Sequence, residues 1–264
     1  VYPPGSTFKL VTAAAALSTG KYTKDSVIPG PATLKLPLSN NRLPNENGKA
    51  CGPSNKTTLE NALRISCNTA FASLGLAIGN DAIAQQAEKF GFNQSFSVPL
   101  NSATSNYPLD ADRPQTALSA IGQFDVRSTV LQMALVAAGI GNGGVVMQPY
   151  LVARTRGPDL AILDEVTPKP FGRAVTTEVA GQLRDMMVTV VAKGTGRRAA
   201  IKGVTVAGKT GTAQQGNGRP PHAWFVSFAP ATKPTVAVAV IVEDGGGATE
   251  ISGGRLAAPI ARAV

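Results

Sequence analysis

The hydrophobic pattern of this chain changes once, at Gly194, and that change limits the folds open to it. Before Gly194 the apolar residues recur at the three- and four-residue spacing of amphipathic helices. After it come three short runs rich in β-branched residues, at 204–214, 223–229 and 235–243, which predict antiparallel strands. A last helix is expected at 254–263. The sequence therefore predicts an α+β fold, with an all-helical lobe and an antiparallel sheet flanked by helices.

Helices are expected along most of the first 193 residues. The first is predicted at Ser6–Leu17, because the prolines before it cannot continue an earlier element and its alanine run favours a helix. Residues 19–56 are rich in Pro, Asn, Gly and Lys and predict a loop with a short hairpin. Residues 57–60 have the spacing of a capping box, which would open a helix ending near Ile65. Further helices are expected at 69–78, 81–90, 114–121, 128–140 and 177–193.

The net charge and the aromatic content limit the kinds of molecule that this chain is expected to bind. The 25 basic and 16 acidic residues leave a net charge of +9, which favours anionic surroundings such as a membrane surface, a wall polymer or a nucleic acid. The basic residues are dispersed and only 5% of the chain is aromatic, so no nucleic-acid partner is expected. The densest basic cluster, Lys193, Arg197, Arg198 and Lys202, is interpreted as a solvated loop. No apolar run reaches the roughly 18 residues that span a bilayer.

Histidine and cysteine are too scarce for a metal centre. The single histidine, His222, excludes any site with two imidazoles, and two cysteines cannot supply a four-thiolate zinc site. We therefore expect no metal and no cofactor, and a structural role for His222. Cys51 and Cys67 are compatible with one disulfide or with two free thiols, and composition does not decide between them.

Ser6 and Lys9 bring a hydroxyl and an amine to one face at the start of a predicted helix. A neutral lysine there can take the serine proton if burial or nearby cations lower its pKa, and the N–H groups of the helix start can stabilise an oxyanion. The pattern alone is weak, because Ser18 and Lys21 have the same spacing. The structural alternative is a capping serine beside a solvated lysine.

Ser66 and Asn68 lie at a break between two predicted helices, where side chains can be held rigidly towards a cleft. The same pattern occurs at Ser39–Asn41 in a stretch that is expected to be a loop. As a structural alternative, Ser66 and Asn68 would be a C-cap followed by an N-cap.

A Lys-Thr-Gly-Thr segment occurs once, at residues 209–212, inside a predicted strand. On an exposed edge, Gly211 would leave room for an extended peptide to pair with the backbone. Lys209 and the hydroxyls of Thr210 and Thr212 would suit a terminal carboxylate. The alternative is a plain surface strand.

Taken in this order, the three motifs resemble the S-x-x-K, S-x-N and K-T-G triplet of penicillin-binding proteins and serine β-lactamases. Four segments also look like those of class B transpeptidases: Tyr2–Lys9, Asn142–Gly144, Gly194–Gly196 and Ala207–Gln214. The resemblance spans nearly the whole chain. It implies the penicillin-binding, serine β-lactamase-like transpeptidase fold.

The resemblance also implies a reaction. Ser6 would attack the carbonyl between the last two D-alanines of a peptidoglycan stem peptide, and a neighbouring stem's amine would resolve the acyl-enzyme. Lys9 would be the base for Ser6, Ser66 would relay a proton to the leaving amine, and Asn68 would orient the substrate amide.

The third motif would bind the substrate. Lys209 would supply a positive field, and Thr210 and Thr212 would hold the carboxylate beside Gly211. The backbone N–H groups of Ser6 and Thr212 would form the oxyanion hole, each donor being worth roughly 3 kcal/mol of barrier. β-Lactam antibiotics would then inhibit the enzyme covalently.

Two departures limit the alternatives. No E-x-x-L-N segment lies between Asn68 and Lys209, so a class A β-lactamase is not expected. Class D enzymes and related sensor domains usually carry valine where this chain has Asn68. A D,D-carboxypeptidase, a non-enzymatic β-lactam sensor and a plainly structural module stay open.

The family also implies an organisation. One transpeptidase domain would cover 1–264, with a nucleophile helix at 1–18, a mainly helical lobe at about 19–176 and a sheet lobe with a terminal helix at about 177–264. An N-terminal anchor, a non-catalytic module and the first sheet strands are expected to be absent from this chain, which would leave an incomplete sheet. The domain would face the outside of the bacterial plasma membrane, with other cell-wall synthesis or division proteins as partners.

An oxidising exterior bears on the two cysteines. There, a disulfide between Cys51 and Cys67 would raise the free energy of unfolding by about 3 kcal/mol. It would also tether the segment that begins at Cys51 to Asn68. We hypothesise such a disulfide.

Overall fold

The computed structural model describes residues 1–98, 100–216 and 218–264. A three-stranded antiparallel sheet is formed by β9 (Ala207–Ala213), β10 (His222–Ala229) and β11 (Val236–Val242), in the order β11-β10-β9. The three predicted strands are thus confirmed, each within a few residues of its expected bounds. β9 carries the Lys-Thr-Gly-Thr segment and is an edge strand of this sheet.

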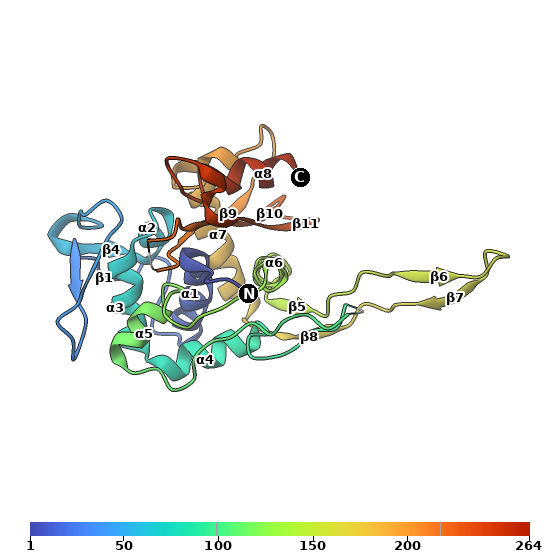
Figure 1. Ribbon diagram of the computed structural model, residues 1–264, viewed down its shortest axis with the longest axis horizontal. Helices are drawn as coiled ribbons and strands as arrows, with labels where there is room; N and C mark the ends of the chain where they lie inside the picture. The colour runs from blue at the N-terminus through green and yellow to red at the C-terminus, as the bar shows by residue number, and fades with distance from the viewer. Residues whose placement is uncertain (99, 217) are drawn as a thin grey trace.

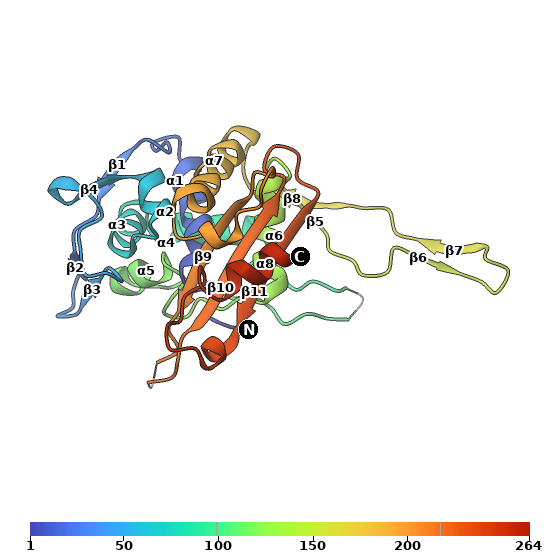
Figure 2. The same ribbon diagram turned by 90° about the horizontal axis from the view of Figure 1, so that it is seen from above.

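Helices cover both faces of the sheet (Figures 1 and 2). On one face α6 (Val130–Gly141) packs on β10 and β11, and α7 (Thr177–Lys193) packs on β9. On the other face α8 (Ala257–Ala263) covers β10 and β11. Successive side chains of a strand point to opposite faces of the sheet, so both faces of β10 need a cover. Trp224 belongs to the main core, whereas Phe225 belongs to the cluster under α8.

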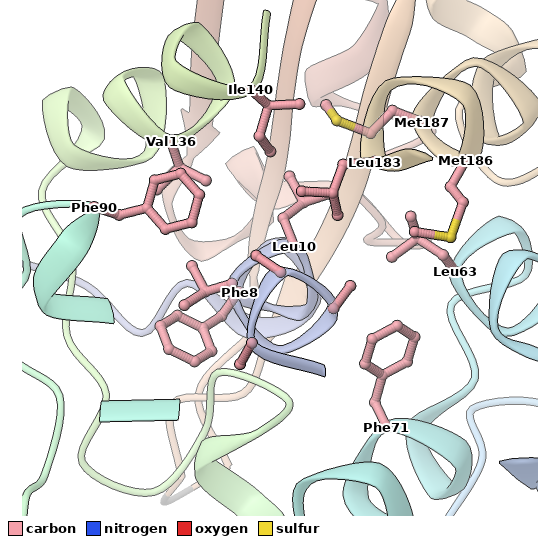
Figure 3. Close-up of a cluster of buried hydrophobic side chains, with 14 of the residues drawn as sticks. Phe8, Leu10, Leu63, Phe71, Phe90, Val136, Ile140, Leu183, Met186 and Met187 are labelled. Atoms are coloured by element: carbon pink, nitrogen blue, oxygen red, sulfur yellow. The ribbon is translucent and has the colours of Figure 1, made fainter. Parts of the chain in front are cut away.

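The helix α1 (Lys9–Ser18) runs through the centre of the molecule, and every residue from Lys9 to Leu17 is buried. It follows a 3₁₀ turn, η1 (Gly5–Phe8). The helix predicted at Ser6–Leu17 is therefore at its expected position, but its first turn is a tighter 3₁₀ turn. Its alanines let other helices approach closely. Figure 3 shows Phe8 and Leu10 among buried side chains of the surrounding helices: Leu63, Phe71, Phe90, Val136, Ile140, Leu183, Met186 and Met187.

The other predicted helices are confirmed. They are α2 (Leu59–Arg64), α3 (Asn68–Ile78), α4 (Asn80–Lys89) and α5 (Arg113–Ser119). The predicted capping box is wrong by one residue. The N-cap of α2 is Thr58, whose hydroxyl accepts the Asn61 N–H at 3.1 Å. The spacing pointed to Thr57 because Glu60 follows it by three residues, whereas Thr58 is followed at that spacing by Asn61.

The predicted loop at 19–56 contains short strands. The hairpin expected there is formed by β2 (Thr33–Lys35) and β3 (Arg42–Pro44). In addition, β1 (Val27–Pro29) pairs with β4 (Lys56–Thr58), which closes the segment into a flap over α3. Short 3₁₀ turns complete the chain: η2 (Pro53–Asn55), η3 (Arg197–Ala199) and η4 (Glu243–Gly247).

A long two-stranded arm projects from the helical side and is not anticipated by the sequence (Figure 1). Its base is β5 (Val145–Met147) paired with β8 (Pro170–Arg173), and its tip is β6 (Arg154–Arg156) paired with β7 (Ile162–Glu165). Every residue of β6 and β7 is exposed. Among the described residues, no helix has the length and apolarity needed to cross a membrane.

The exposure of the arm predicts that the core folds without it. Replacing residues 150–167 by Asn-Gly keeps the backbone bond from Gln148 N to Lys169 O at the base. Because the removed residues bury little, calorimetry should show a Tm within about 2 °C of the unmodified chain. A fall of more than about 5 °C would show that the arm stabilises the core.

Candidate active site

Ser6 stands in η1, where the chain is held against the sheet. The indole N–H of Trp224 donates to the Pro3 carbonyl at 3.0 Å, and the Gly5 N–H donates to the Gly122 carbonyl at 3.0 Å. Gly5 has φ +52°, and a Cβ there would lie 2.8 Å from the Thr212 carbonyl oxygen. A side chain at this position would thus push the turn that carries Ser6 off β9.

Lys9, one turn after Ser6, points its amine into a buried polar cluster. Its Nζ donates to the Ser66 carbonyl at 2.7 Å and to Asn68 Oδ1 at 2.7 Å, and it lies 3.3 Å from Ser66 Oγ. The side chain is 0% exposed. The first two motifs therefore meet in space although 57 residues separate Lys9 from Ser66.

Ser66 lies at the break between α2 and α3 with φ +61°, a strained region for a residue with a side chain. The capping alternative does not describe this break. Ile65 is the C-cap of α2, and Cys67 is the N-cap of α3, its sulfur accepting the Ala70 N–H at 3.4 Å. The hydroxyl of Ser66 and the amide of Asn68 thus stay free for the cluster.

The third motif reaches the same cluster from β9. Lys209 Nζ donates to Ser66 Oγ at 2.8 Å and to the Thr210 carbonyl at 2.8 Å, and its side chain is 0% exposed. Gly211 lets this strand approach η1, because a Cβ there would lie 3.0 Å from the Pro4 carbonyl oxygen. Although β9 is an edge strand, only Thr212 in it is even partly exposed.

Burial lowers the pKa of both lysine amines. Burial lowers the pKa of Lys9 well below its ordinary value of 10.5, and the positive charge of Lys209 lowers it further. Burial also lowers the pKa of Lys209, to about 7. The carboxylate of Glu46 opposes both shifts. Burial beside a second amine thus favours the neutral form of Lys9, which a general base requires.

A cavity of about 530 Å³ opens beside this cluster. Ser6, Asn68 and Thr212 line it, and so does Gln214, the last residue of the Ala207–Gln214 segment. The cavity is also lined by residues that the sequence did not single out: Leu43, Pro44, Asn45, Glu46, Leu118, Ile121, Gln123 and Phe124. Thr210 is turned elsewhere, since it is 5% exposed and its Oγ1 lies 2.7 Å from that of Thr195. These extra residues come from β3, the end of α5 and the segments that follow them, and no motif spacing in the sequence marks them.

Cys51 and Cys67 form a disulfide, with Cα atoms 6.1 Å apart. Asn45 adds polar links between the flap and α3: its Oδ1 accepts the Thr69 N–H at 3.0 Å, and its Nδ2 donates to the carbonyls of Pro31 and Lys49. The cavity wall at 43–46 is therefore fixed to the segment that carries Asn68.

The competing sequence patterns lie outside this cluster. Ser18 is at the opposite end of α1 from Lys9, where its hydroxyl bonds Gln86 Oε1 at 3.3 Å. Ser39–Asn41 lies at the turn between β2 and β3. His222 Nδ1 accepts the Asp244 N–H at 3.1 Å, as expected of a structural histidine. Within the described ranges no three His, Cys, Asp or Glu residues gather as a metal site would require.

The whole chain matches one known protein family. Residues 1–264 match the family described as "Penicillin binding protein transpeptidase domain". The chain belongs to this family. The resemblance drawn from the three motifs is confirmed, and so is the α+β transpeptidase fold.

Relatives of this transpeptidase domain include two mycobacterial proteins named "Peptidoglycan D,D-transpeptidase PbpA". The one from Mycolicibacterium smegmatis is 47% identical over 99% of the chain, and the one from Mycobacterium tuberculosis is 44% identical over all of it. The sequence also looks similar to mycobacterial penicillin-binding protein A, and these matches confirm that narrower resemblance. The chain spans 54% of each relative's length, about half.

Solved structures of penicillin-binding proteins and transpeptidase domains have the same fold as this chain. Penicillin-binding protein A from M. tuberculosis, in its ceftriaxone acyl-enzyme complex, has a TM-score of 0.95 and 43% identity, covering 99% of this chain and 59% of that one. Its penicillin G acyl-enzyme complex has a TM-score of 0.91 and the same identity, covering 99% and 60%. A D,D-transpeptidase domain from Eggerthella lenta has a TM-score of 0.86 and 36% identity, covering 99% and 65%.

The disulfide predicts a measurable stability difference. Replacing Cys51 and Cys67 together by serine keeps an acceptor at the α3 N-cap but opens the loop, so the free energy of unfolding should fall by about 3 kcal/mol. Urea denaturation measures this. As the control, reduced wild-type protein should show the same loss, while the double variant should not respond to reductant. A double variant as stable as oxidised wild type would contradict the expectation.

Proposed function

We propose that this domain is a serine D,D-transpeptidase that cross-links peptidoglycan stem peptides through an acyl-enzyme on Ser6. One observation carries the proposal: two buried lysine amines converge on the Ser66 hydroxyl beside the cavity that Ser6 lines. The names of the mycobacterial relatives and the acyl-enzyme complexes of the similar structures support it.

Lys9 is suited to be the base in the first step. Its two short bonds, to the Ser66 carbonyl and to Asn68 Oδ1, use the two hydrogens of a neutral amine and leave its lone pair available. The Ser6 hydroxyl gives its proton to that lone pair while Oγ attacks the carbonyl carbon of the penultimate D-alanine. The bond order of the carbonyl falls, and its oxygen becomes an oxyanion.

Ser66 and Lys209 serve the second half of acylation. The developing leaving amine needs a proton, and the Ser66 hydroxyl lies between Lys9 and Lys209 as a relay. The amide bond then breaks, D-alanine leaves, and an ester joins the stem peptide to Ser6. The protonated fraction of Lys209 stabilises negative charge in this dry site.

The remaining motif residues bind the substrate. Thr212 lines the cavity, and the backbone around Gly5 packs on its carbonyl, so the N–H groups of Ser6 and Thr212 are assigned to the oxyanion hole. Asn68 orients the substrate amide. Thr212 is better placed than Thr210 to meet the terminal carboxylate, because the Thr210 hydroxyl bonds Thr195.

The setting of the enzyme belongs to the same proposal. Peptidoglycan is assembled outside the plasma membrane, and the Cys51–Cys67 disulfide suits that oxidising compartment. We place the domain on the extracytoplasmic face, anchored through an N-terminal segment, with cell-wall synthesis or division proteins as partners. β-Lactams are expected as covalent inhibitors, because the similar structures hold them as acyl-enzymes.

Labelling with fluorescent penicillin tests the proposal. Peptide mapping should find the adduct on Ser6, and Ser6→Ala should reduce labelling at least ~10³-fold because the nucleophile is gone. Ser18→Ala is the matched control, since Ser18 has the same spacing to a lysine and should label normally. Label on another residue would overturn the assignment.

The fate of the acyl group separates the alternatives. A transpeptidase should hold the penicilloyl group for hours and should transfer an acyl-D-alanyl group from a thioester to an added D-amino acid. Release by water alone would indicate a D,D-carboxypeptidase. Labelling without thioester turnover would indicate a sensor.

A further inference from the structure

The cavity that Ser6 lines has an apolar side as well as a polar one. Leu43, Leu118, Ile121 and Phe124 line the apolar side. Leu43 and Leu118 pack against the same small buried cluster, so β3 and the end of α5 meet there. Phe124 is the most exposed of the four, with 42% of its surface accessible. An exposed ring in a cavity wall is available for contact with an apolar part of a substrate.

Phe124 is held in a backbone conformation that a bulky residue rarely adopts. Its φ is +60°, in a turn closed by the bond from the Val126 N–H to the Gln123 carbonyl at 3.3 Å, and glycine is favoured at such a position. Arg127 Nη1 donates to the Phe124 carbonyl at 2.9 Å, and the backbones of Arg127 and Asn106 exchange two bonds. A strained residue that its surroundings hold in place points to a function for its side chain.

This turn is attached to the segment that carries Ser6. Gly122, two residues before Phe124, accepts the N–H of the residue before Ser6 at 3.0 Å. Beyond the turn, Tyr2 and Ser128 exchange two backbone bonds, at 2.9 and 2.8 Å. Backbone bonds on both sides of the turn therefore place the ring of Phe124 relative to Ser6.

Glu46 brings one carboxylate to the same cavity. Its side chain is exposed and forms no hydrogen bond or ion pair with any residue that the structure describes. The neighbouring Asn45 accepts the Thr69 N–H at 3.0 Å, directly after Asn68, so the flap carries Glu46 to the segment that orients the substrate amide. A carboxylate held there without a counter-ion attracts a cation.

The two features suit the part of the donor that stays on Ser6. The donor's terminal carboxylate is assigned to Thr212, its scissile carbonyl to the oxyanion hole, and the amide before that carbonyl to Asn68. The residue that precedes the penultimate D-alanine is the next part of the stem. It is thus the part that meets the remaining lining of the cavity, which includes Glu46 and Phe124.

The reaction indicates which group that part of the stem carries. Donor and acceptor are stems of the same polymer, and the acceptor attacks with an amine. This amine belongs to a side chain, because the main-chain nitrogens of a stem are in amide bonds. Each donor therefore carries the same amine, which is not used while that stem is the donor. An aliphatic side chain that ends in an ammonium matches a cavity with an apolar wall and one carboxylate.

We propose that Phe124 and Glu46 select the donor stem: the ring of Phe124 packs on the methylene groups of the amine-bearing side chain, and Glu46 binds its ammonium. This inference rests on the transpeptidase function proposed above. It assigns donor selection to two residues outside the three motifs.

Three donors that differ in one residue separate the two contacts. Each is an acetyl-X-D-alanyl thioester in which X is lysine, norleucine or alanine. Norleucine has the four side-chain carbons of lysine without the amine, and alanine has only one carbon. The measurement is the ratio of kcat/KM between two donors on one preparation, so the fraction of active protein cancels. The wild-type protein should prefer lysine to norleucine and norleucine to alanine.

Phe124→Gly tests the apolar contact. Glycine adopts a positive φ without strain, so the turn should be kept. The variant should lower the norleucine-to-alanine ratio about fivefold and leave the lysine-to-norleucine ratio unchanged, because only contact with the methylene groups is lost. Tyr150→Gly is the matched control: it removes a ring of similar exposure, 43%, from the arm and should change neither ratio.

Glu46→Gln tests the contact with the ammonium. It should lower the lysine-to-norleucine ratio about threefold and leave the norleucine-to-alanine ratio unchanged, because only the lysine donor carries the charge. Any effect of Glu46 on the ionisation of Lys9 and Lys209 acts on all three donors alike and cancels in the ratio. Glu165→Gln, on the exposed arm, is the control and should change neither ratio.

A Phe124→Gly protein with the wild-type norleucine-to-alanine ratio would overturn the inference, and so would a Glu46→Gln protein with the wild-type lysine-to-norleucine ratio. In both cases turnover of the thioesters would still support the enzyme. A wild-type protein that neither labels at Ser6 nor turns over any of the donors would instead overturn the proposed function. The two failures are therefore distinguishable.

Discussion

Two buried lysine amines share the hydroxyl of Ser66, and the rest of the structure is arranged to keep them there. Burying a charged amine costs several kcal/mol unless it is paired or neutralised. The site lowers that cost by surrounding Lys9 and Lys209 with carbonyl, amide and hydroxyl oxygens rather than with a carboxylate in contact. A carboxylate in contact would hold both amines charged, and then no base would be left for Ser6.

Three distant stretches must meet to build this arrangement, and each is fixed by a different device. The alanine-rich α1 fixes Lys9 by complete burial. The disulfide and Asn45 fix the break that carries Ser66. The sheet fixes Lys209, and glycines at positions 5 and 211 allow η1 and β9 to touch. Rigid support of this kind gives the site its geometry, whereas the exposed arm at β6 and β7 lies outside it.

Much of the fold could be predicted because its elements follow local rules. The bounds of α7 are the predicted ones, since Thr176 caps it and Gly194 ends it. The arm could not be predicted because its residues are exposed on both faces, and no periodicity then marks a strand. Its register comes from cross-strand contacts such as the Arg154–Glu165 ion pair, which no local pattern shows.

The residues of the candidate site could be predicted where they belong to a motif of fixed spacing, and the others could not. Ser6 and Lys9 are three residues apart, so one helical turn places them on the same face. Glu46 carries no such signal: it sits in a polar stretch between β3 and η2, and only the folding of the flap over α3 brings it to the cavity. Thr210 is the opposite example. The motif predicts that its hydroxyl binds the substrate carboxylate, but in the structure this hydroxyl bonds Thr195.

The ionisation of the two buried lysine amines can be measured directly. NMR titration of the lysine side chains, assigned with Lys9→Met and Lys209→Met, reports the ionisation of each amine. We expect the pKa of Lys9 to lie well below its ordinary value of 10.5 and the pKa of Lys209 to be about 7, so both amines lose a proton at lower pH than exposed lysines do. Titration of both amines near 10.5 would contradict the account, because neither could then serve Ser6 as a base.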